Sequence, residues 1–222
     1  MEAAVAAARP RSVARWTILG GVLYVIFFVV GTIVLFGGAP DGDAAPAKVI
    51  QWYSDSGHRD RVNTGWVLIT LSVFCLLWFI AALRRAVSMV DGEGILTGVV
   101  GIGGGIYAAL AFASVGLNTG IRTMSDDTYQ HRVFPDLIHA AGDVSWVMHA
   151  TGAVGLGAMI IAASLAFMWG GVWPSWAGWV GVVVGFLTLA SVAFFPQFLF
   201  LLWILIVSIV IFMKSRPAGR VA

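Results

Sequence analysis

Apolar residues in this chain gather into six long runs, and short polar segments separate them. The runs cover residues 16–36, 64–83, 95–117, 144–169, 176–195 and 198–213. A helix needs about 20 apolar residues to cross the hydrocarbon core of a bilayer. The pattern therefore predicts an all-α polytopic membrane protein with six transmembrane helices, of which the last is the shortest.

A shorter segment between the first two runs has a different pattern. Val49, Ile50 and Tyr53 fall on one face of a helix, with Trp52 beside them, and Pro46 suits a first turn. Aromatic residues on such a face favour the headgroup region of a membrane. We expect a short amphipathic helix over residues 46–56 that lies at the outer membrane interface.

Composition supports lipid as the main solvent of this chain. Hydrophobic residues make up 59% of the 222 residues and charged residues 11%, and the mean hydropathy is +0.92. A soluble domain carries roughly 25% charged residues. We expect one transmembrane domain over residues 1–222. The single cysteine, Cys75, excludes a disulfide within the chain, and the net charge of +2 gives no reason to expect nucleic acid as a partner.

Charged residues are distributed unequally between the two sides that six crossings would create. One side, which includes both ends of the chain, holds eight of the 13 Lys and Arg residues and three acidic residues. The other side holds five basic and eight acidic residues. Because basic segments stay in the cytoplasm, we expect both termini there, in a bacterial inner membrane.

Glycine is concentrated in two of the runs. Gly101 and Gly105 form a GxxxG pair in the third run, and Gly178, Gly181 and Gly185 form a stripe in the fifth. Small residues at this spacing let helices approach closely in lipid. The stripes could pack within one chain or between copies in a homo-oligomer.

Ionisable residues with potential chemistry gather around the start of the fourth run. Asp136, His139 and Asp143 share one helix face, Trp146 continues it, and His149 lies on another side. An ionisable group at the bilayer centre costs at least about 2.5–3.5 kcal/mol, so it must face protein or water. We expect Asp143 to be buried and to pair with one of three arginines in the outer segments, Arg122, Arg59 or Arg61.

Three interpretations of this cluster remain open. It could be structural, with Asp143 pinning the outer loops, or it could line an outward-facing pocket for a cation, a proton or a small amphiphile. It could also hold a metal in a membrane hydrolase, with Asp136, His139 and Asp143 joined by His131 or His149 as ligands.

A non-enzymatic protein with an outward-facing polar pocket is the favoured interpretation, because signatures such as H-E-x-x-H and G-x-S-x-G are absent from the sequence. No catalytic residue, metal or cofactor is assigned. The expected partners are membrane lipid and a small amphiphile or cation. The candidate binding residues are Asp143, His139, His149, Asp136, Trp146 and Arg122.

Several segments together resemble those of a known group of proteins. They are the amphipathic segment 47–53 with its polar continuation to Arg61, the polar start of the fourth run, the Trp- and Gly-containing start of the fifth, and the aromatic residues on both sides of Pro196. In this layout the chain resembles a bacterial family of six-helix integral membrane proteins of unknown function. The resemblance implies six helices and assigns no activity.

Overall fold

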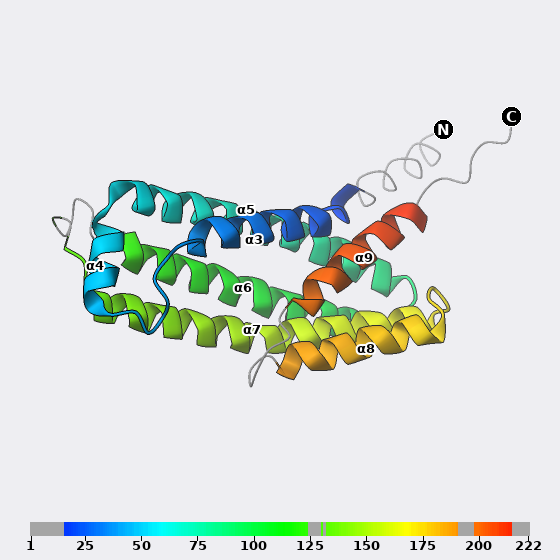
Figure 1. Cartoon of the computed structure of the whole chain (residues 1–222). Helices are drawn as coiled ribbons and strands as arrows, with labels where there is room; N and C mark the ends of the chain where they lie inside the picture. The colour runs from blue at the N-terminus through cyan, green and yellow to red at the C-terminus, as the bar shows by residue number, and fades with distance from the viewer. Residues whose placement is uncertain (1–15, 124–129, 131, 191–197, 215–222) are drawn as a thin grey trace, which may run out of the picture.

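The computed structural model describes residues 16–123, 130, 132–190 and 198–214, and these residues form an all-α bundle (Figure 1). The predicted fold class is confirmed at this level. The described helices are α3 (Gly20–Phe36), α4 (Pro46–Ser54), α5 (Ser56–Ser88), α6 (Ile95–Thr123), α7 (Pro135–Trp169), α8 (Ser175–Leu189) and α9 (Leu199–Lys214).

Three of the described helices, α5, α6 and α7, are long and apolar enough to cross a membrane. The other apolar helices, α3, α8 and α9, have 17, 15 and 16 residues and are shorter than a typical span. The predicted end of the fifth span, residues 191–195, and Pro196 lie outside the described residues. The long helices fit a membrane protein.

Helix boundaries extend beyond the apolar runs on the side of the bundle that carries α4. Residues 57–61, a polar stretch outside the predicted runs, belong to the first turns of α5, where the Asp55 side chain accepts a hydrogen bond from the His58 backbone N–H at 3.0 Å. Helix α6 continues past Leu117 to Thr123, and α7 begins at Pro135. Hydropathy detects only the apolar part of a helix. Helical residues that are polar, because they lie beyond the membrane or face the protein interior, therefore fall outside the predicted runs.

The helices pack in chain order. Helix α3 packs on α5, α5 on α6, α6 on α7 and α7 on α8, while α9 contacts α3 and α8. Figure 1 shows that α4 lies across one end of the bundle, while α3 begins and α9 ends at the other. Helix α8 runs beside only the half of α7 that is remote from α4, and α9 lies in the same half of the bundle. The half near α4 is therefore built mainly from α3, α5, α6 and α7.

Glycines lie at the closest helix crossings, but some of these glycines differ from the ones that the sequence pattern predicts. A Cβ atom on Gly103 of α6 would lie 2.4 Å from the carbonyl oxygen of Gly155 on α7. A Cβ atom on Gly105 would meet nothing within 4 Å, and one on Gly101 would meet the Arg84 side chain. The predicted Gly101–Gly105 pair is therefore wrong as a helix contact within the chain, because the Gly103 side of α6 turns toward α7.

The predicted glycine stripe of the fifth run is confirmed as a contact surface. Cβ atoms on Gly178, Gly181 and Gly185 would each lie less than 3 Å from atoms of α7. These residues let α8 pack closely along α7.

Helix α4 is present where the amphipathic pattern predicts a helix, and it is two residues shorter than the expected 46–56. Its Val49 and Tyr53 side chains are each 1% exposed, because they pack with Leu35, Val62 and other residues of a small apolar cluster. The apolar face of α4 is thus used largely for docking onto the bundle. This docking places Tyr53 beside Arg122, near the C-terminal end of α6.

Candidate functional site

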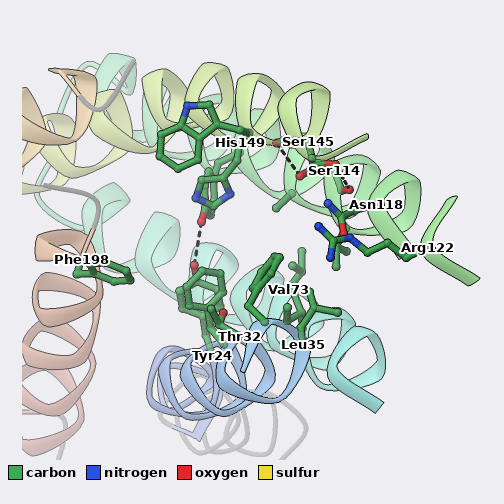
Figure 2. A pocket seen from close by; sticks show the side chains of 18 residues that line it. Tyr24, Thr32, Leu35, Val73, Ser114, Asn118, Arg122, Ser145, His149 and Phe198 are labelled. Carbon is green, nitrogen blue, oxygen red and sulfur yellow. Dashed lines mark hydrogen bonds between the residues drawn. The ribbon is translucent and has the colours of Figure 1, made fainter. Parts of the chain in front are cut away.

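A cavity of about 350 Å³ lies among α3, α5, α6 and α7, in the half of the bundle near α4 (Figure 2). We call it the inner cavity. Figure 2 shows α3 side chains, among them Tyr24 and Leu35, opposite Ser145 and His149 of α7. Its described lining residues are Tyr24, Phe28, Thr32, Leu35, Phe36, Ile69, Val73, Tyr107, Ala111, Ser114, Val115, Asn118, Arg122, Gly142, Ser145, Trp146, His149 and Phe198.

Most of the wall is apolar, and α6 supplies a line of polar groups. Ser114, Asn118 and Arg122 follow one another at intervals of four residues, which places them on one helix face. Asn118 is only 5% exposed and Arg122 only 9%. The extension of α6 beyond Leu117 is what brings Asn118 and Arg122 into the cavity.

The Arg122 guanidinium is held by aromatic groups. Its Nη1 donates a hydrogen bond to the Tyr53 hydroxyl, and its central carbon lies 5.5 Å from the ring centroids of both Phe36 and Tyr53. Burial raises the pKa of the Tyr53 phenol, and the nearby guanidinium opposes that rise. Tyr53 is therefore a neutral hydrogen-bond partner at physiological pH.

Two buried polar atoms on residues that line the inner cavity have no partner among the described residues. They are Nε of Arg122 and Oδ1 of Asn118. No described carboxylate lies within 4 Å of the Arg122 guanidinium nitrogens. Buried polar groups in folded proteins are nearly always hydrogen-bonded, so these atoms indicate a place where a ligand or water would bind.

The opposite end of the inner cavity has a second polar group. The hydroxyl oxygens of Tyr24 and Tyr107 lie 3.0 Å apart and share a hydrogen bond. The His149 ring meets Tyr107 edge to face at 5.5 Å and stacks on Phe28 at 6.3 Å. Between the two ends, Ser114 and Ser145 each donate to the other's backbone carbonyl, at 2.8 and 3.0 Å, and so tie α6 to α7.

A second cavity of about 300 Å³ adjoins the first on the side of α4. We call it the outer cavity. The two cavities share Phe36, Arg122 and Gly142, so they meet at the Arg122 side chain. The outer cavity is lined by Phe36, Ala39, Pro40, Asp41, Gly42, Val49, Tyr53, Arg122, Ile138, His139, Gly142 and Asp143.

The structure divides the predicted binding residues between these cavities. Trp146, His149 and Arg122 line the inner cavity, where Trp146 is half exposed. His139 lines the outer cavity with a buried Nε2 that has no described partner, and Asp143 lines it as well. Asp136 is exposed and lines neither cavity.

The expected burial and ion pairing of Asp143 are wrong. Its side chain is exposed, because the first turns of α7 extend beyond the apolar run and carry it to the surface. The described hydrogen bonds of Arg59, Arg61 and Arg122 go to the Tyr53 and Ser54 carbonyls, the Val34 carbonyl and the Tyr53 hydroxyl. Of the charged residues described as lining the two cavities, the buried one is a cation, Arg122.

The described residues do not support the alternative metal site. No three His, Cys, Asp or Glu residues within the described ranges come together as metal ligands, so Asp136, His139 and Asp143 do not form a ligand set. His131, the further ligand considered, lies outside the described residues.

Sequence reasoning missed Asn118, Ser114 and the Tyr24–Tyr107 pair. The four-residue spacing from Ser114 to Arg122 was a usable signal, but ending the helix at Leu117 assigned its last two members to a loop. Tyr24 and Tyr107 are isolated in apolar runs, and nothing in the sequence links them.

Comparison of the chain with protein-family models, with curated proteins and with solved structures gives no match. The resemblance to a six-helix bacterial membrane family therefore stays a prediction.

Proposed function

We propose that this chain is a six-pass protein of a bacterial inner membrane that binds a small amphiphilic molecule in the inner cavity and is not an enzyme. Six crossings are supported by three long apolar helices and three shorter ones, which pack together in one bundle. The proposed ligand would lie among α3, α5, α6 and α7.

Charge supports the orientation with both termini in the cytoplasm. Arg84 and Arg85 lie near the end of α5 and Lys214 ends α9, and both helices end at the side of the bundle where α3 begins. Basic residues favour the cytoplasmic side. The outer cavity, with Asp41 and Asp143, would then open toward the periplasm.

Single cysteines test this orientation in a Cys75→Ala background. Asp43 and Glu93 are exposed at opposite ends of the bundle. A membrane-impermeant maleimide should label Asp43→Cys in intact spheroplasts, and Glu93→Cys only after the membrane is opened. The reverse labelling pattern would refute the orientation.

The observation that carries the binding proposal is the combination of apolar walls with buried polar atoms that lack partners. An apolar cavity of about 350 Å³ lies within the range of small-molecule sites, roughly 300–1,000 Å³. Arg122 Nε and Asn118 Oδ1 stand at one end of it without described partners. An amphiphile suits this arrangement, because its tail covers the apolar wall and its polar head reaches the donor on Arg122.

A cavity-filling substitution tests this function. Ala111 is 8% exposed and lines the inner cavity, whereas Ala109 on the same helix is exposed and lines neither cavity. We expect Ala111→Phe to fill the site and Ala109→Phe to leave it open. Protein in nanodiscs would be titrated with dodecanoate, dodecyl phosphate, dodecanol and dodecyltrimethylammonium, and bound ligand would be counted by native mass spectrometry.

The proposal predicts that at least one of these compounds binds the wild type with one-to-one stoichiometry. Ala111→Phe should lose that binding and Ala109→Phe should keep it. If none of the four binds, or if Ala111→Phe binds as the wild type does, the inner cavity is not a ligand site.

A further inference from the structure

We infer that the ligand of the inner cavity is an anion, namely a single-chain amphiphile whose carboxylate or phosphate monoester head binds Arg122. This inference rests on the proposed function and adds the chemical class of the ligand. Arg122 is the only Lys, Arg, Asp or Glu among the described residues that line the inner cavity.

A cation buried in this way needs an anion. Arg122 is 9% exposed, and no described carboxylate lies within 4 Å of it. Removing an ionised group from water is costly unless an opposite charge and hydrogen bonds compensate for the lost hydration. The neutral phenol of Tyr53 and the ring of Phe36 surround the guanidinium, and these two groups replace only part of that hydration.

The guanidinium also has a free donor for such a head group. Nη1 is used by the Tyr53 hydroxyl, while Nε is buried without a described partner. Guanidinium donors match the geometry of carboxylate and phosphate oxygens, and these charge-assisted bonds are stronger than neutral ones. Asn118 lies one helical turn away on the same face, and its amide Nδ2 can donate a further hydrogen bond to the head group, while its Oδ1 accepts and needs a separate donor such as water.

The acidic residues nearby lie on the other side of Arg122. Asp41 and Asp143 line the outer cavity and are exposed, and neither lines the inner cavity. Water screens such exposed charges. Their position favours an anionic head on the inner side of Arg122 and not between Arg122 and the carboxylates.

The tail follows from the shape of the rest of the cavity. From Arg122 the wall continues along α6 to Tyr107, fifteen residues earlier, which is about 22 Å of helix. A volume of about 350 Å³ is near the lower end of the range for small-molecule sites. A long and narrow space of this size suits one hydrocarbon chain better than the two chains of a phospholipid.

The test compares head groups on the same twelve-carbon chain with the full-length protein in nanodiscs. We expect dodecanoate or dodecyl phosphate to bind the wild type about 10-fold to 100-fold more tightly than dodecanol, the range set by a hydrogen bond to a charged group. Dodecyltrimethylammonium should bind more weakly than dodecanol. The anion that binds more tightly identifies the head group. If inorganic phosphate, which has no hydrocarbon chain, displaces the bound anion, the ligand is a soluble anion and the inference of an amphiphile is wrong.

Matched variants connect this preference to one side chain. Arg122→Gln should reduce the affinity for both anions to that for dodecanol and leave dodecanol binding unchanged. Arg132→Gln removes a charge from an exposed position at the same end of the bundle, outside both cavities, and should change neither. Arg122→Lys should keep only part of the preference, because it retains the charge without the guanidinium fork.

Each outcome separates this inference from the proposed function. If dodecanol or dodecyltrimethylammonium binds as tightly as the anions, with binding still lost in Ala111→Phe, the inner cavity is a ligand site and the anion is wrong. If no compound binds, both proposals fail. The comparison of head groups on the wild type decides even if Arg122→Gln does not fold.

Discussion

Adding one methyl group to α6 should show which of its glycines faces α7. The structure places Gly103 at this crossing, whereas the sequence pattern favours Gly105. In Gly103→Ala the new Cβ would lie 2.4 Å from the Gly155 carbonyl oxygen and 3.3 Å from the Met159 nitrogen. Both neighbours are backbone atoms, so no side chain can rotate away. In Gly105→Ala the same methyl group meets nothing within 4 Å.

The expected magnitude follows from this geometry. Contacts of Cβ atoms shorter than 3.0 Å are essentially never seen, so α6 and α7 must separate locally by at least 0.6 Å in Gly103→Ala. Overpacking of this kind costs about 1–3 kcal/mol. Replacing glycine by alanine in a helix returns up to about 1 kcal/mol, and it does so equally at both positions. The two variants should therefore differ in stability by about 1–3 kcal/mol, with Gly105→Ala the more stable.

Reversible unfolding in mixed detergent micelles measures this difference. The free energy of unfolding would be compared for the wild type and the two variants under identical conditions. Equal stabilities of Gly103→Ala and Gly105→Ala would refute the crossing described here. A selective loss in Gly105→Ala, accompanied by a smaller particle in size-exclusion chromatography, would show that this face of α6 packs between copies of the chain.

Three further variants test smaller features. Tyr53→Phe removes the hydroxyl that accepts from Arg122, so the free energy of unfolding in detergent should fall by about 1–3 kcal/mol. Alanine at both Ser114 and Ser145 removes two hydrogen bonds between α6 and α7, and the same assay should show a loss of about 1 kcal/mol. Asp91 accepts from the Thr97 backbone N–H at 2.7 Å, which lowers the pKa of its carboxyl group. A lowered folded-state pKa stabilises the protein above the unfolded value of about 4, so this contribution should be lost on acidification below about pH 4 in thermal denaturation scans, and Asp91→Asn should lack that loss.

The candidate site was only partly predictable. The sequence pattern located the region, because Asp136, His139 and Asp143 are conspicuous beside an apolar run. It misjudged which charge is buried. Asp143 is on the surface of α7, while Arg122 is buried at the end of α6. The pattern of polar residues along a chain predicts where a helix leaves the apolar part of the membrane, but it does not predict which face of the helix points into the bundle.

The helical class of this protein and its membrane character follow from composition and the spacing of apolar runs. Both depend on local properties, namely the number of apolar residues in each run and the free-energy cost of exposing backbone polar groups to lipid. The bundle alone determines that Gly103 and not Gly105 meets α7, and that Tyr53 of α4 holds Arg122 of α6. Those contacts join residues far apart in the chain, and the rotation of each helix about its axis sets them. Hydropathy leaves that rotation undetermined, because lipid and protein interior are almost equally apolar.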